Sequence, residues 1–115
     1  MRNIELSDRT KSFALRVIKL YGALPKRAEC EVIGKQLLRS GTSVAANYRE
    51  ACRARTKAEL VSKFHIVVQE LDETQLWLEL LTDAGFVKAD RLQPLQKESD
   101  ELLSIFVASI KTASR

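Results

Sequence analysis

The sequence predicts an all-α protein, an antiparallel up-and-down four-helix bundle that forms a single domain over residues 1–115. Apolar residues recur at alternating spacings of three and four along four segments. A mean period near 3.5 is what helices need to pack almost parallel with a left-handed twist. With only four Gly and two Pro, the chain offers few of the turns that a many-stranded β fold requires. Short links between the segments should make neighbouring helices antiparallel.

The first two helices are delimited by a cap and a proline. Ser7 is a favourable N-cap, so we expect the first helix to run from Ser7 to Leu24 and to stop at Pro25. The second should extend from about Ala28 to Ala54. On each helix the residues at these spacings form one stripe that should face the core, which we call the seam. The seam of the first helix is Leu6, Thr10, Phe13, Val17, Leu20 and Leu24, and that of the second is Ile33, Leu37, Ser40, Val44, Asn47 and Ala51.

The third and fourth helices carry capping signals of their own. Thr56 followed by Glu59 forms a capping box, and the third helix should end near Ala84-Gly85. Asp90 is the expected cap of the fourth helix, where Pro94 would still lie in the first turn. The seams are Leu60, Phe64, Val67, Leu71, Thr74, Leu78 and Leu81, then Leu92, Leu95, Ser99, Leu102, Phe106, Ser109 and Ala113.

Small polar residues interrupt the seam of the second helix. Ser40, Ser43 and Asn47 can hold helix register through buried hydrogen bonds, which we favour over a ligand site. Gly41 lowers helix propensity unless a close approach between helices uses the missing side chain.

Residues for catalysis or metal binding do not assemble in this sequence. His65 is the single His and has no Glu three residues before it, unlike the di-iron pattern of helical bundles. Cys30 and Cys52 form no CxxC pair, and HExxH, GxSxG and Gly-rich phosphate loops are absent. We therefore expect a protein that is not an enzyme and uses no cofactor or metal. A charged N-terminus and the lack of a long apolar run favour a cytoplasmic protein without membrane association.

The third helix has apolar side chains away from its seam. At about 100° per residue, three of them fall almost opposite the seam and one flanks them. One interpretation is that the bundle and its loops cover these residues; the other is a subunit interface anchored by the tryptophan. The residues are Ile66, Trp77 and Leu80, flanked by Leu76.

A stripe of basic residues follows the outward face of the second helix. It comprises Lys35, Arg39, Arg49 and Arg53, and Arg55 and Lys57 continue it into the next turn. At 1.5 Å per residue the stripe spans about 27 Å. Such a ridge can neutralise several phosphates of RNA or DNA. Since no aromatic residue alternates with the cations, binding should have little sequence specificity.

Charge is divided between two regions of the chain. Residues 35–63 contain seven basic and two acidic residues, a net +5, whereas residues 64–83 contain five acidic residues and no Lys or Arg, a net −5. The stripe can therefore be a solvated helix face, a partner for the acidic third helix of another subunit, a nucleic-acid site or a protein-binding site.

Residues 36–51, QLLRSGTSVAANYREA, resemble the signature of the bacterial four-helix-bundle family, whose members include ribosomal-protein-like products of intervening sequences in large-subunit ribosomal RNA genes. The family pattern Q-L-x-R-S-x-x-S-I-x-x-N is matched at Gln36, Leu37, Arg39, Ser40, Ser43 and Asn47, with Val44 in place of Ile. Tyr48-Arg49-Glu50-Ala51 replaces the commoner I-A-E-G tail, and W-L-E-L-L follows from Trp77. Both features are similar to one branch of the family.

This resemblance implies an assembly and a class of partner. Members are similar to the accessory protein of diversity-generating retroelements, a five-membered barrel of bundles with a basic surface that contacts nucleic acid and a reverse transcriptase. A homopentamer that associates with RNA or DNA is thus implied. The sequence-based hypothesis is a non-enzymatic homo-oligomer that binds nucleic-acid backbone through the basic stripe. The alternative is an adaptor that docks a protein such as a polymerase on the outer face of the third helix.

Overall fold

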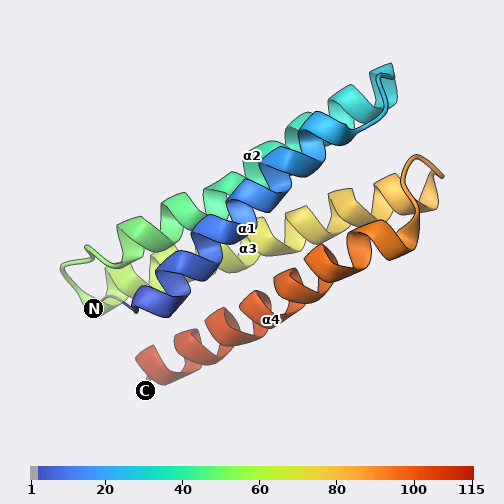
Figure 1. Ribbon diagram of the computed structural model, residues 1–115. Coiled ribbons are helices and arrows are strands. Elements are labelled where there is room, and N and C mark those ends of the chain that lie inside the picture. The colour runs from blue at the N-terminus through green and yellow to red at the C-terminus, as the bar shows by residue number, and fades with distance from the viewer. Residues whose placement is uncertain (1–2) are drawn as a thin grey trace.

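The computed structural model describes residues 3–115 and consists of four long helices (Figure 1). They are α1 (Ile4–Ala23), α2 (Ala28–Ala51), α3 (Lys57–Asp83) and α4 (Ala89–Ala113). Residues 3–115 contain no β-strand, and the molecule measures 45 × 20 × 19 Å along its principal axes. The predicted fold class is confirmed; the first two residues of the predicted domain lie outside the described part.

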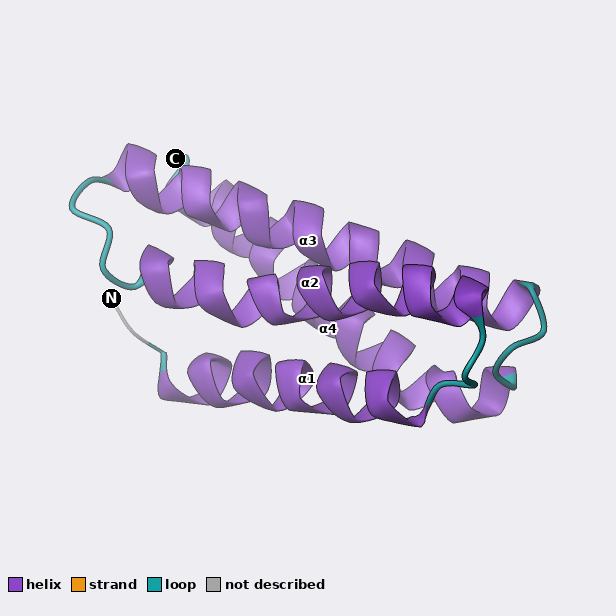
Figure 2. Ribbon diagram, turned by 90° about the horizontal axis from the view of Figure 1, so that it is seen from above, coloured by secondary structure: helices purple, strands orange, loops and turns teal. Residues whose placement is uncertain are grey.

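The helices run up and down, and each packs against its neighbours in the chain. The links from α1 to α2 and from α3 to α4 lie at one end of the bundle, and the link from α2 to α3 lies at the other end with the C-terminus (Figure 2). In the described residues, the backbones of the diagonal pairs α1–α3 and α2–α4 stay farther apart than those of adjacent helices, and α4 closes the bundle against α1 less tightly than the other adjacent helices pack.

Both predicted boundaries of α3 are confirmed. The Thr56 side chain accepts a hydrogen bond from the Glu59 N–H at 3.0 Å. At the other end, Gly85 has a φ of 82°, and the Phe86 N–H donates to the Leu81 carbonyl at 3.0 Å. This is the glycine-based helix ending in which a left-handed residue turns the chain away.

The starts of two other helices differ from the prediction. α1 begins three residues before Ser7, because the Asn3 side chain accepts from the Leu6 N–H at 3.0 Å and caps the helix instead. α4 begins at Ala89 after Lys88, so Asp90 lies inside the first turn, where its charge favours the positive end of the helix dipole. Pro94 consequently lies in the second turn of α4, not in the first.

The end of α2 also differs, since the helix stops at Ala51 instead of Ala54. The N–H groups of Arg53 and Ala54 bond three residues back, to the carbonyls of Glu50 and Ala51, at 3.0 and 3.1 Å. These shorter steps tighten the chain into a turn before Thr56 starts α3.

The predicted seams form the core, and the fully buried side chains come from all four helices. They include Phe13, Val17, Leu37, Val44, Val67, Leu71, Leu78, Leu81, Leu102 and Phe106. Within this core the Ser40 and Thr74 hydroxyls are 2.9 Å apart and link α2 to α3, as expected for a buried polar pair that fixes register. Ser43 and Asn47 are half-buried and bond to carbonyls of α2 itself.

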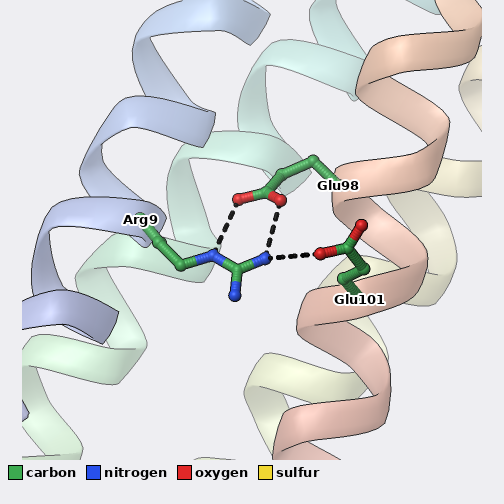
Figure 3. A network of polar contacts seen from close by, with 3 residues as sticks. All are labelled: Arg9, Glu98 and Glu101. Atoms are coloured by element: carbon green, nitrogen blue, oxygen red, sulfur yellow. Dashed lines mark hydrogen bonds and ion pairs between the residues drawn. The ribbon is translucent and has the colours of Figure 1, made fainter.

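An ion-pair network ties α1 to α4 (Figure 3). Arg9 donates from Nε to Glu98 Oε2 at 3.1 Å and from Nη2 to Glu98 Oε1 at 2.7 Å, and Nη2 also lies 3.2 Å from Glu101 Oε1. The hydrogen bond to Glu98 raises the pKa of Arg9 above its ordinary value. Two parallel hydrogen bonds fix the guanidinium plane, so this pair also aligns α1 with α4, the two adjacent helices that pack least tightly.

Candidate nucleic-acid interface

The basic stripe lies on the face of α2 opposite the core. Lys35, Arg39 and Arg49 are exposed, whereas Leu37 and Val44, about half a turn away from the stripe, are fully buried. Because α2 remains helical from Lys35 to Arg49, the alternating spacing places these three cations along one outer ridge. Arg53 lies beyond the last helical residue and is also exposed. The ridge therefore continues from the helix into the turn.

Lys35, at the far end of the stripe, is already partnered. Its Nζ lies 3.3 Å from Glu31 Oε1, one helical turn earlier, and the Tyr21 hydroxyl donates to the same carboxylate oxygen at 2.8 Å. The Tyr21 hydrogen bond and the Lys35 ammonium lower the pKa of Glu31. Lys35 can still attract a polyanion, but Glu31 cancels part of its field.

The stripe residues Arg39, Arg49 and Arg53 make no ion pair with residues 3–115. No acidic residue lies between positions 32 and 49. The next acid, Glu50, is bound by Lys63 of α3 at 2.7 Å. The carboxylate nearest to the arginines in sequence is thus already paired with another cation.

The two cations in the turn differ from each other. Arg55 is exposed, and its backbone N–H donates to Glu59 at 3.4 Å. Lys57, the first residue of α3, donates from Nζ to the backbone carbonyl of Arg115 at 2.7 Å. Arg55 therefore extends the stripe, because its side chain forms no ion pair within residues 3–115. Lys57 instead reaches toward the C-terminal end of α4.

Where α2 ends, the stripe borders two hollows against the first turns of α1. One has a volume of about 380 Å³, and its charged lining residues are Lys11, Arg49, Arg53 and Glu50. The other, also about 380 Å³, is lined by Ser7, Arg49, Cys52 and Arg53. Lys11 was not among the residues predicted for the stripe, because it belongs to a different helix and no periodicity within α2 points to it.

The apolar residues predicted outside the seam of α3 have two different environments. Leu76 and Leu80 are 46% and 37% exposed, whereas Ile66 and Trp77 are half-buried. Trp77 packs against the core cluster, so the expectation that it lies opposite the seam is wrong: a side chain of this size reaches the core from a flanking position. Its indole N–H is buried and has no hydrogen-bond partner in the described residues.

Residues 3–115 contain neither a cluster of possible metal ligands nor a helix suited to a membrane span. No three His, Cys, Asp or Glu side chains come together as possible metal ligands there. None of the helices combines the length and the apolar character that a membrane span requires.

Comparisons with known proteins match this chain over almost its whole length. A family model described as the 23S rRNA-intervening sequence protein matches residues 2–108. The crystal structure of a protein of unknown function from the S23 ribosomal protein family of Bacteroides thetaiotaomicron is similar in fold, with a TM-score of 0.87. It is 35% identical, and the match covers 92% of this chain and 98% of that one. No curated protein matches the chain.

Proposed function

The chain belongs to the 23S rRNA-intervening sequence protein family, and we propose that it is a non-enzymatic homo-oligomer of helical bundles that binds nucleic-acid backbone. The observation that carries this proposal is the exposed ridge of Arg39, Arg49 and Arg53, which no carboxylate of residues 3–115 neutralises. Guanidinium groups bind phosphate through paired hydrogen bonds. Arginines on a rigid helix face keep their spacing, so several phosphates along one strand can be contacted together.

The proposed binding depends on phosphates more than on bases. No aromatic side chain lies between the cations of the stripe, so stacking adds little. Neutralising phosphates releases counterions, and the logarithm of affinity should fall linearly with the logarithm of salt concentration. Assembly would place several copies of the stripe on one particle, which raises the avidity for a long polyanion. The five-fold assembly comes from the family resemblance described above.

Reversing two charges of the stripe tests the binding proposal. The double variant Arg49→Glu with Arg53→Glu should bind mixed-sequence single-stranded RNA and duplex DNA at least about tenfold more weakly. Its salt dependence should also lose a slope of about 2, since two phosphate contacts disappear. Fluorescence anisotropy between about 50 and 200 mM salt measures both quantities.

A double variant on α4 controls for net charge. Lys97→Glu with Lys111→Glu changes the charge by the same amount at two exposed positions that form no ion pair within residues 3–115. Its affinity should stay within about threefold of the unmodified protein. Equal weakening by both double variants would mean that overall charge, and not the stripe, attracts the nucleic acid. Absence of binding at low salt would contradict the proposal altogether.

Self-association is tested at the exposed leucines of α3. Leu80→Glu should lower the mass measured by light scattering from a multiple of 13.0 kDa, five for a pentamer, toward a single chain. Leu80 is preferable to Trp77 for this purpose, because Trp77 also supports the core of its own chain. Leu15→Glu, at a 57% exposed leucine of α1, is the control and should leave the mass unchanged.

An adaptor is the second candidate function, and the exposure of Leu76 and Leu80 is the observation that favours it. On this hypothesis the outer face of α3 docks a protein such as a polymerase instead of another copy. A single-chain mass for the unmodified protein would exclude the oligomer and favour the adaptor.

A further inference from the structure

The hollow between α1 and the end of α2 concentrates more positive charge than the rest of the stripe. Lys11 comes from the second turn of α1, Arg49 from the last turn of α2, and Arg53 from the turn that follows. All three side chains are exposed, and none forms an ion pair within residues 3–115. Three cations on one concave surface repel one another, and an anion placed among them removes that repulsion.

The rest of the lining contains one negative charge, and that charge is already paired. Glu50 is the one acidic residue among the side chains recorded around this hollow, and Lys63 holds its carboxylate at 2.7 Å. Thr10 is 1% exposed, and its hydroxyl donates to the Ser7 carbonyl at 3.1 Å. Thr10 therefore belongs to the packed wall of the hollow, and the three cations supply its positive charge.

We infer that this hollow is a phosphate site in which Lys11 acts with Arg49 and Arg53 on a single phosphate group. The inference rests on the proposed function where the phosphate belongs to a nucleic-acid strand, and it adds α1 to the interface. The two guanidinium groups can each present a pair of N–H donors, and the ammonium adds a compact point charge. A phosphate in a hollow also loses more water than one on a flat ridge, which strengthens each of these interactions.

The consequence is an uneven stripe. Near Lys35 the helix surface is partly neutralised by Glu31. At the other end, cations from α1 and from the end of α2 line one hollow of about 380 Å³, which is large enough for a phosphate group. A strand should therefore be held most firmly at the α1–α2 end. The same chemistry also suits a free phosphate, and the two sources are separated by experiment.

The test compares Lys11→Gln with Lys19→Gln. Lys19 is an exposed lysine of the same helix that forms no ion pair within residues 3–115 and does not line the hollow. With single-stranded RNA, Lys11→Gln should weaken binding about three- to tenfold and lower the salt slope by about 1, whereas Lys19→Gln should change neither. Lys11→Arg should keep most of the affinity, since it retains the charge.

A second measurement uses inorganic pyrophosphate in place of RNA. Pyrophosphate at millimolar concentration should raise the melting temperature of the unmodified protein and of Lys19→Gln, because a ligand that binds the folded state stabilises it. Lys11→Gln and Arg53→Gln should lose this increase. If pyrophosphate shows this pattern while Lys11→Gln leaves RNA affinity unchanged, the site is supported and its phosphate is a free one.

The outcomes separate the two proposals. If Arg49→Glu with Arg53→Glu weakens RNA binding but Lys11→Gln behaves like Lys19→Gln with both RNA and pyrophosphate, the phosphate site is wrong and the backbone-binding proposal stands. If the unmodified protein binds no RNA, the backbone-binding proposal is wrong, and pyrophosphate alone then decides the site. A melting temperature that pyrophosphate raises equally in all variants would overturn the site.

Discussion

Replacement of Phe106 by alanine is expected to lower the free energy of unfolding by about 3–5 kcal/mol. Phe106 is fully buried on α4, and its ring packs at a steep angle to two others: Tyr48 of α2 at 5.6 Å and Phe64 of α3 at 5.5 Å between centroids. Such edge-to-face pairs add to the hydrophobic contribution of the buried ring. The alanine variant would therefore lose side-chain contacts that join three helices, α2, α3 and α4. Urea denaturation followed by circular dichroism measures the loss.

The neighbouring cavity explains why this position should be sensitive. Tyr48 and Phe64 also line an apolar cavity of about 570 Å³, bounded by the start of α1 and the last turns of α4. Removing Phe106 would take away the side chain against which both rings pack, next to a cavity that is already there. Phe106→Leu, which keeps most of the volume, should cost about 1.5 kcal/mol or less.

The adjacent residue provides the control for Phe106. Val107 is 39% exposed, so Val107→Ala should change stability by no more than about 0.5 kcal/mol. Because unfolding of an oligomer depends on protein concentration, all variants are compared at one concentration. A loss in Phe106→Ala no larger than in Val107→Ala would show that the aromatic contacts do not hold this end of the bundle together.

The parts of the fold that sequence predicts are those encoded by local signals. The period of the apolar seams identified all four helices, since a side chain turned toward the core repeats every three or four residues. Thr56 and Gly85 marked the limits of α3 correctly because a hydroxyl cap and a left-handed glycine satisfy backbone groups within a single turn. The antiparallel order followed from the shortness of the links.

Prediction of a helix start from sequence fails where two local signals compete. Asn3 and Ser7 are both favourable N-caps, and only packing decides that the additional turn from Ile4 is helical. At α4 the acidic Asp90 is suited to the cap and also to the first turn, and the structure places it in the first turn after Lys88. Neither choice can be ranked without the neighbouring helices.

The candidate site likewise has one part that the sequence predicts and another part that it does not. The outward ridge of Arg39 and Arg49 was predictable because both positions belong to one helix whose core face is known. The convergence of Lys11 on Arg49 was not, since it depends on how far α1 extends beside α2. The pair of Glu31 with Lys35 is a local i,i+4 pattern that the sequence does contain, whereas the contact of Trp77 with the core depends on the neighbouring helices.

Gly41→Ala is expected to destabilise the protein by about 1–3 kcal/mol, although alanine is the better helix former. A Cβ at position 41 would lie 2.7 Å from Val17 Cγ2 and 2.8 Å from Val17 Cγ1. Val17 is fully buried, and a β-branched side chain in a helix has one strongly preferred rotamer. It cannot turn aside, so α1 and α2 would have to separate. Thermal or urea denaturation measures the effect.

Gly22→Ala is the matched control, because it makes the same change at an exposed helical position of α1 where a Cβ would meet no atom within 4 Å. It should stabilise the protein by about 0.5–1 kcal/mol through helix propensity alone. If Gly41→Ala lowers the stability of the protein while Gly22→Ala raises it, the difference is direct evidence for the close approach of α1 to α2. If Gly41→Ala instead stabilised the protein as much as Gly22→Ala, the two helices would lie farther apart than the structure has them. Lys11 would then be displaced from Arg49 and Arg53, so this measurement also bears on the phosphate site that the two helices form.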